Sequence, residues 1–150
     1  MPESLWDLYC GVGGFALAAA RAGFPRVTGV EVSSGAISSA ISAARHAGLS
    51  RGAATFIAED ATAWARAQPP KDIPDVIVVN PPRRGIGTEL ATYLNECAAP
   101  RVIYSSCNPR SLAKDLASMP ALHPVEGRVF DMFPHTTHAE VALLLERERA

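Results

Sequence analysis

Cys107 follows a short apolar run, residues 101–104 (RVIY), and precedes Pro109 and Ser111, which suit the first turn of a helix. The pattern predicts a buried strand that ends near the thiol and a helix that begins directly after it. In open α/β sheets, ligands bind at the carboxyl ends of the strands, and a neighbouring helix N-terminus favours the reactive thiolate. Cys107 is therefore a candidate nucleophile, although the thiol taken alone favours a buried, inert cysteine.

A glycine loop follows the first apolar run of the chain, residues 4–9. Gly11, Gly13 and Gly14 allow the backbone to turn sharply and to approach a ligand closely. The next apolar run ends in Glu31, close to the twenty-residue offset at which nucleotide-binding folds place a carboxylate for a ribose. The glycine loop alone is weak evidence, but its spacing from Glu31 predicts a cofactor that carries a ribose.

Asn80 follows a continuous apolar run and is itself followed by two prolines, two arginines and a glycine. A proline disfavours helical geometry in the residue before it, so Pro81 should hold Asn80 extended at the end of its strand. The side-chain amide would then project into the crevice at the sheet edge. A simple Asn-Pro turn is the alternative, but this composition at a strand end favours a binding loop.

The remaining segments alternate between short apolar runs and amphipathic stretches, which predicts an α/β fold with a mostly parallel sheet and an antiparallel pair at the end of the chain. Strands are predicted at residues 4–9, 26–30, 54–58, 75–79, 101–104, 125–130 and 140–145. Helices are predicted at residues 15–22, 34–46, 88–97 and 109–118, with one more after Asp60. Ser34 is the expected N-cap of its helix. Asp60 is expected either to cap the next helix or to meet the adenine end of a cofactor.

The composition suits a single globular domain with a hydrophobic core, because 48% of the 150 residues are hydrophobic and 19% are charged. The net charge of -1 gives no general attraction to nucleic acid. The three cysteines form no Cys-x-x-Cys pair, which argues against a zinc site and against a disulfide framework. With neither a signal peptide nor a membrane-spanning run in the sequence, we expect a cytoplasmic protein.

Four strand ends should therefore meet at one edge of the sheet: the glycine loop, Glu31, Asn80 and Cys107. Glu140, which follows the last loop, could join them. Such a group would combine a cofactor site, a polar clamp, a nucleophile and a base in one site.

The motifs themselves resemble those of the RNA uracil-5-methyltransferase family, and are most similar to the bacterial branch that forms 5-methyluridine in 23S ribosomal RNA. The similar segments are residues 7–15 (DLYCGVGGF), 79–85 (VNPPRRG), 104–108 (YSSCN) and 131–136 (DMFPHT), followed by His138 and Glu140. They span nearly the whole chain in the family's order. The resemblance implies a Rossmann-like class I S-adenosylmethionine-dependent methyltransferase fold.

The resemblance also implies roles for individual residues. S-adenosylmethionine would be the cofactor, and Tyr9, Glu31 and Asn80 match the family's cofactor contacts, with Gly11 of the glycine loop beside them and Asp60 as a weaker addition. Cys107 would be the nucleophile and Glu140 the base. The substrate would be RNA, most plausibly 23S ribosomal RNA.

The reaction explains why these residue types are needed. Carbon 5 of uracil is a poor nucleophile until a thiolate adds to carbon 6, and the proton on carbon 5 must later be removed by a base such as Glu140. His135 and His138 are second candidates for proton handling, or else they merely order the loop. The target base must leave its stack, so an unpaired uridine is the expected substrate.

Family members usually also carry an upstream RNA-binding β-barrel, often iron–sulfur cysteines, and a glutamine that contacts the cofactor. We expect residues 1–150 to be the catalytic domain alone, without the barrel, without an iron–sulfur cluster and without a bound metal. Such a chain should fold and bind S-adenosylmethionine weakly, yet methylate RNA poorly.

Two other functions stay open on the sequence. An exocyclic-amine methyltransferase also has an Asn-Pro-Pro motif, but it places an aromatic residue where Arg83 stands and needs no cysteine. A truncated or degenerate domain could bind the cofactor or a partner without turnover. A dehydrogenase is disfavoured because the glycine loop lacks a third glycine at the spacing that binds a pyrophosphate.

Overall fold

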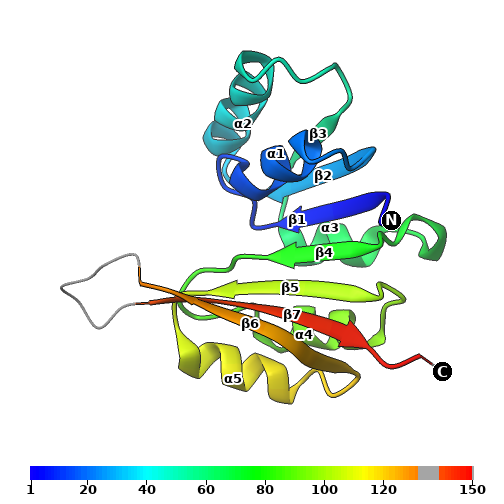
Figure 1. The fold of residues 1–150 in the computed structure, drawn as a ribbon, viewed down its shortest axis with the longest axis vertical. Helices are drawn as coiled ribbons and strands as arrows, with labels where there is room; N and C mark the ends of the chain where they lie inside the picture. The colour runs from blue at the N-terminus through cyan, green and yellow to red at the C-terminus, as the bar shows by residue number, and fades with distance from the viewer. Residues whose placement is uncertain (132–138, 150) are drawn as a thin grey trace.

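The structure is a computed structural model that describes residues 1–131 and 139–149 of the chain. Its described residues form one seven-stranded sheet with the strand order β3-β2-β1-β4-β5-β7-β6 (Figure 1). Strands β1 to β5 run parallel to one another, whereas β7 runs antiparallel to both β5 and β6. The predicted mostly parallel sheet with an antiparallel end is therefore confirmed.

All of the predicted elements are present, and a short 3-10 helix adds to them. The strands are β1 (Ser4–Leu8), β2 (Arg26–Glu31), β3 (Ala54–Ala58), β4 (Val76–Val79), β5 (Arg101–Ser106), β6 (Leu122–Phe130) and β7 (Glu140–Arg147). The helices are α1 (Gly14–Arg21), α2 (Ser34–His46), α3 (Ala61–Ala67), η1 (Pro70–Asp72), α4 (Gly87–Glu96) and α5 (Pro109–Ala117). None of these helices is long and apolar enough to cross a membrane.

Most predicted boundaries lie within two residues of those observed, but a predicted N-cap and the predicted start of one strand are wrong. The N-cap of α2 is Ser33 and not Ser34, because the Ser33 hydroxyl accepts the backbone N–H of Ala36 at 3.2 Å. Strand β6 begins at Leu122, three residues before the predicted start, and it passes through Pro124. A proline is tolerated there because β6 lies at the edge of the sheet.

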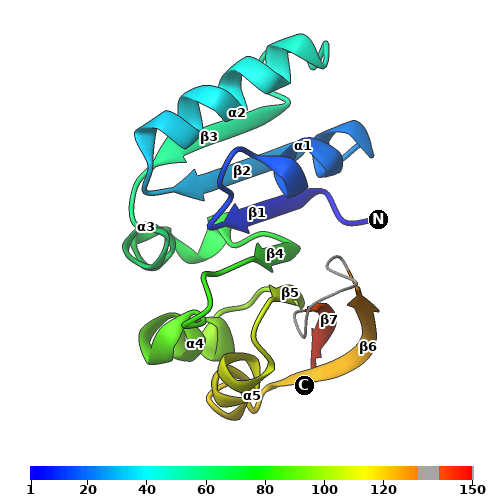
Figure 2. The same ribbon diagram turned by 90° about the vertical axis from the view of Figure 1, so that its left-hand side faces the viewer.

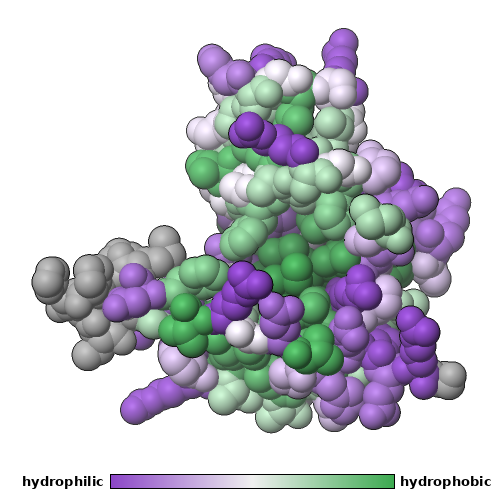
Figure 3. Space-filling view, viewed as in Figure 1, coloured by the Kyte–Doolittle hydropathy of each residue, from purple (hydrophilic) through white to green (hydrophobic). Residues whose placement is uncertain are grey.

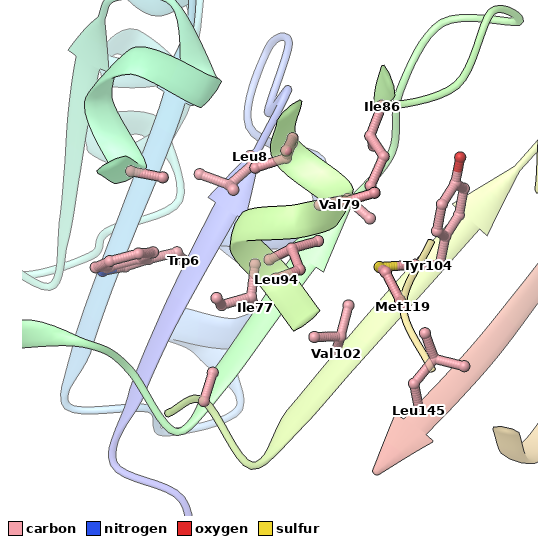
Figure 4. Packing of buried hydrophobic residues seen from close by; sticks show 14 of the residues in the cluster. Trp6, Leu8, Ile77, Val79, Ile86, Leu94, Val102, Tyr104, Met119 and Leu145 are labelled. Atoms are coloured by element: carbon pink, nitrogen blue, oxygen red, sulfur yellow. The ribbon is translucent and has the colours of Figure 1, made fainter. Parts of the chain in front are cut away.

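Helices cover the two faces of the sheet unequally. One face carries α3, α4 and α5, and the main hydrophobic core lies beneath them, with fully buried side chains that include Leu8, Ile77, Leu94 and Tyr104 (Figures 2 and 4). The opposite face carries α1 and α2, which lie over β1, β2 and β3 (Figure 1). On that side, hydrophobic residues gather at the surface over β4 and β5 (Figure 3).

Asp7 is a fully buried carboxyl group on β1 that holds the start of α1. Its Oδ2 accepts the backbone N–H of Ala16 at 2.9 Å, while Oδ1 is buried and has no hydrogen-bond partner among the described residues. Burial raises the pKa of Asp7 from 3.8 to about 7, although the bond from Ala16 opposes that rise. The glycine loop is therefore fastened to the sheet by a carboxyl group that titrates near neutral pH.

This buried acid should make folding stability depend on pH. The pKa of Asp7 is higher in the folded state than in the unfolded state, so its contribution is fully present below about pH 3.8 and is lost as the pH rises through about 7. We expect the free energy of unfolding in urea to fall between pH 5 and pH 8 by at most about 1.4 kcal/mol per pH unit. The variant Asp7→Asn should show a flatter profile. Asp72→Asn, at an exposed position, is the matched control and should keep the wild-type slope, whereas equal slopes for all three proteins would contradict the assignment.

Candidate active site

The candidate residues lie along the carboxyl edge of the parallel strands. Because β7 runs in the opposite direction, its first residue reaches the same edge. In sheet order, this edge carries Asp60 after β3, Glu31 at the end of β2, Tyr9 after β1, Asn80 after β4, Cys107 after β5 and Glu140 at the start of β7. The chain reverses its direction of travel across the sheet between β1 and β4, and such a switch point is where open α/β sheets bind ligands.

Tyr9 and the glycine loop form an unusual backbone segment at this switch point. Tyr9 has a φ of 62°, and it is the only residue other than glycine with a positive φ in the described part of the chain. A left-handed conformation costs a residue with a side chain about 1–2 kcal/mol, so the surrounding structure must enforce it. The half-buried ring places its hydroxyl beside Thr62, and burial raises the pKa of that hydroxyl.

The glycines at Gly11 and Gly13 serve different needs. Gly11 has a φ of 54°, and a Cβ built there would meet nothing within 4 Å, so this part of the loop faces open space. Gly13 has a φ of 91°, and a Cβ there would lie 3.1 Å from both Ala40 and the ring of Phe56. The first glycine therefore leaves room for a ligand, and the second lets the loop pack closely against α2 and β3.

Glu31 is half-buried at the end of β2 and has a spare acceptor. Its Oε2 accepts the backbone N–H of Ser33 at 2.8 Å, while the structure shows no hydrogen-bond partner for Oε1 among the described residues. Asp60 is exposed, and its Oδ2 caps α3 by accepting the N–H of Ala63 at 2.9 Å. The predicted capping role of Asp60 is confirmed, and its carboxylate still faces solvent beside the same edge.

Asn80 continues from β4 into a loop that α5 holds in place. The Asn80 side chain is exposed, and its backbone N–H donates to the Leu8 carbonyl at 3.5 Å. Farther along this loop, the carbonyl of Arg83 accepts two hydrogen bonds, from Asn108 Nδ2 at 2.9 Å and from the Ser111 hydroxyl at 2.8 Å. The helix that follows Cys107 thus fixes the loop that follows Asn80.

A buried carboxylate makes the same connection one turn farther along α5. Asp115 Oδ2 accepts the hydroxyl of Tyr104 at 2.5 Å and the backbone N–H of Ile86 at 2.9 Å. Gly85 is required beside it, because its φ is 85° and a Cβ there would collide with the Asp115 carboxylate. Burial and the bond to Asp115 raise the pKa of Tyr104, so its hydroxyl stays a donor.

Cys107 and Glu140 come from neighbouring antiparallel strands. The ladder between β5 and β7 ends with Ser106 opposite Val141, and the next residues outward are Cys107 and Glu140. The Ser105 hydroxyl donates to Glu140 Oε2 at 3.3 Å, which turns the carboxylate toward β5. A half-buried thiol and a half-buried carboxylate therefore lie at adjacent strand ends.

The other two thiols are poorly suited to nucleophilic chemistry. Cys10 is buried, and burial, followed by the nearby Asp7 and Glu31 carboxylates, raises its pKa to about 12. Burial also raises the pKa of Cys97. Because the thiolate is the reactive form, these two cysteines are inert near neutral pH.

Some sequence predictions lie outside the described residues, and one feature of the site was not predicted. Pro134, His135 and His138 fall between residues 132 and 138, which the structure does not describe. The tether through Ser111 and Asp115 was missed, although their spacing of four residues on the buried side of α5 is a sequence signal for it. In the described part of the chain, no three His, Cys, Asp or Glu side chains cluster in a way that could hold a metal ion.

The hydrogen bonds of Asp115 predict that a single substitution at this position lowers the free energy of unfolding strongly. Asp115→Ala would leave the Ile86 N–H and the Tyr104 hydroxyl without an acceptor, so we expect a loss of about 2–4 kcal/mol in the free energy of unfolding. Lys114→Ala, on the exposed side of the same helix, is the matched control and should change stability by less than about 0.5 kcal/mol. Urea titration followed by the fluorescence of Trp6 and Trp64 would measure both, and a change below about 1 kcal/mol for Asp115→Ala would contradict the assigned role.

Comparison with known proteins identifies relatives of this chain. The family model described as tRNA (Uracil-5-)-methyltransferase matches residues 72–148. The 23S rRNA (uracil(747)-C(5))-methyltransferase RlmC of Shewanella pealeana is 49% identical over 144 residues, which are 96% of this chain and 37% of the relative. The protein of the same name from Halothiobacillus neapolitanus is 48% identical over 99% of this chain and 39% of the relative. The chain thus spans less than two fifths of these relatives.

A solved structure supports the same conclusion. The tRNA (uracil-54, C5)-methyltransferase of Pyrococcus abyssi, in complex with S-adenosyl-L-homocysteine, aligns with a TM-score of 0.81 and 31% identity. The alignment covers 95% of this chain and 34% of that protein. The expected S-adenosylmethionine-dependent methyltransferase fold is confirmed, and the chain belongs to the RNA uracil-5-methyltransferase family.

Proposed function

We propose that this chain is the catalytic part of an enzyme that methylates carbon 5 of a uridine in 23S ribosomal RNA, with S-adenosylmethionine as the methyl donor. The observation that carries the proposal is that Cys107 and Glu140 lie at adjacent strand ends, on the sheet edge that also holds the glycine loop. A methyltransferase that acts on an amine needs no thiol there. The names of the similar RlmC proteins support the choice of 23S rRNA.

The cofactor would lie across the switch point between β1 and β4. The open space above Gly11 fits the close approach of a ligand to the loop, and the spare Oε1 of Glu31 fits a ribose hydroxyl. Tyr9 and the exposed amide of Asn80 would flank the sulfonium end, and Asp60 would meet the adenine end. Each contact uses a group that projects from a strand end.

The thiolate of Cys107 would add to carbon 6 of the uracil, and the electrons of the carbon 5–carbon 6 double bond would move into an enolate over carbons 5 and 4. The bound cofactor supplies an electrophilic methyl group for carbon 5. Glu140 would then remove the proton from carbon 5, and the carbon 6–sulfur bond would break to restore the double bond and the thiolate. Because Ser105 holds the Glu140 carboxylate toward β5, the base and the nucleophile would act on adjacent atoms of one ring.

RNA recognition would depend largely on parts of the relatives that this chain does not span. Arg83, Arg84 and Arg110 are exposed around the site and could contact phosphates there. A net charge of -1 offers no further surplus, whereas affinity for structured RNA normally requires many phosphate contacts. We therefore propose that the chain alone methylates RNA slowly, even though it holds the catalytic groups.

A covalent trap tests the proposed nucleophile. RNA that contains 5-fluorouridine should form a stable adduct with the chain in the presence of S-adenosylmethionine, because fluorine on carbon 5 cannot leave as a proton does. Cys107→Ala should form no adduct, and Cys97→Ala should form as much as the wild type. Denaturing gel electrophoresis and intact mass would score the result. An adduct that survives Cys107→Ala would exclude this nucleophile, and a wild-type chain that never forms one would favour a cofactor-binding domain without turnover.

The role of Glu140 predicts a different phenotype. Glu140→Gln keeps the shape of the side chain but removes the base, so methyl transfer should occur once while release of the product stalls. We expect a covalent, methylated adduct to accumulate on ordinary uridine RNA, with turnover lowered by about 10²–10⁴-fold. The control Glu148→Gln, at an exposed position near the other end of β7, should turn over normally. Normal turnover by Glu140→Gln would assign the base to another residue.

The proposed ribose contact can be measured without RNA. Loss of a charge-assisted hydrogen bond of about 1.5–3 kcal/mol should weaken binding of S-adenosylmethionine by one to two orders of magnitude in Glu31→Ala. Isothermal titration calorimetry would give the dissociation constants. Glu59→Ala removes an exposed carboxylate after β3 and should leave the affinity unchanged. If both variants bind the cofactor as tightly as the wild type, Glu31 does not hold the ribose.

A further inference from the structure

Strand β6 leaves one of its edges open. It is the last strand of the sheet and pairs only with β7 in the described part of the chain. All of its residues after Leu122 are exposed, including Val125, Val129 and Phe130, whose exposed fractions are 54%, 72% and 47%. Soluble proteins usually shorten such an edge or protect it with charge, because its free backbone groups can pair with another strand.

The sequence of β6 is complementary to itself in the antiparallel direction. Gly127 lies at the centre of the segment 123–131 (HPVEGRVFD). If two copies of the segment pair antiparallel about Gly127, each residue faces one of matching chemistry. The pairs are His123 with Asp131, Pro124 with Phe130, Val125 with Val129, and Glu126 with Arg128.

We propose that β6 is the interface of a symmetric homodimer, in which β6 of one copy pairs antiparallel with β6 of a second copy about Gly127. Such a two-fold contact requires that residue i of one copy meets residue j of the other and that j meets i. The pattern around Gly127 satisfies this requirement for charged and apolar residues alike. The two seven-stranded sheets would join into one continuous sheet.

The charges of β6 are already arranged for this pairing. Within one copy, Arg128 Nη2 lies 3.3 Å from Glu126 Oε1, because residues two apart on a strand share a face. In the dimer, each of these side chains would also lie opposite its counter-charge in the second copy, which gives four alternating charges on one face. Opposite charges directly across a strand pair stabilise it, and like charges destabilise it.

Gly127 suits the position on the two-fold axis. On the axis it would meet the same residue of the second copy, and a Cβ at this position would lie 3.0 Å from Leu143 Cδ2 on β7 of its own chain, so packing within each copy also favours glycine. The ladder with β7 shifts register between Pro124 and Glu126, so the strand is bent at Val125 and the regular pairing is short. The area buried by one short strand pair falls well below that of a standard interface. We therefore expect half of the chains to be dimeric at a concentration on the order of tens of micromolar.

Charge reversal with mixing tests this interface. Glu126→Arg places arginine opposite arginine in a homodimer, and Arg128→Glu places glutamate opposite glutamate, so each variant should dimerise at least about tenfold more weakly than the wild type. An equimolar mixture of the two variants restores both opposite-charge pairs and should dimerise like the wild type. The double variant Glu126→Arg/Arg128→Glu is also self-complementary and should dimerise as well. Sedimentation velocity from about 5 to about 500 μM would measure the wild type, the two single variants, their mixture and the double variant.

Three results would overturn the proposal. The wild type could stay monomeric over the whole range, the single variants could dimerise as tightly as the wild type, or their mixture could stay monomeric. Association through the hydrophobic surface over β4 and β5 would not depend on opposite charges pairing at residues 126 and 128, so it would give the second result. Circular dichroism of each variant would verify that these exposed substitutions leave the fold intact. This test measures mass alone, so its outcome is independent of the proposed methylation.

Discussion

The parallel pairing of β4 with both β1 and β5 is the constraint on which the rest of this structure depends. All four residues of β4 are buried, and the strand joins the two halves of the sheet at the point where the chain reverses direction. On one side lie the strands that carry the glycine loop and Glu31. On the other lie the strands that carry Cys107 and Glu140. A single strand therefore sets the distance between the proposed binding of the cofactor and the proposed chemistry on the base.

The loop after β4 is fixed by α5, which lies in the half of the molecule that carries Cys107. Its carbonyl at Arg83 and its N–H at Ile86 are both held by side chains of α5, the helix that begins just after Cys107. The loop that carries Asn80 is consequently fixed to the helix that begins after Cys107. This arrangement gives a physical reason for the glycine and the two prolines of the loop, since they shape a backbone that must dock against a helix and also present an amide.

The sequence allowed the seven strands, the mostly parallel sheet and the site edge to be predicted, because these follow from local patterns. Apolar runs, a glycine loop and a proline after Asn80 are each visible within a few residues. The tether at Asp115 was not predicted, since its partners Tyr104 and Ile86 come together only when α5 packs on the sheet. The early start of β6 was missed for the opposite reason: a local rule against proline was outweighed by the edge position of the strand.

The alternation of core-facing and outward-facing side chains along β7 protects the register of this strand, and therefore the geometry of the site, against a shift by one residue. Leu145 is buried on one face of β7, and Val141 and Leu143 pack against the same core, whereas Glu140 points to the other face with Ala142 and Leu144. A shift of β7 by one residue would bring Glu140 and Glu146 to the core face and would move Leu143 and Leu145 out of it. Packing in the hydrophobic core thus fixes the register of β7 against β5, and with it the relative positions of the two strand ends. The Glu140 carboxylate therefore keeps its position relative to the end of β5.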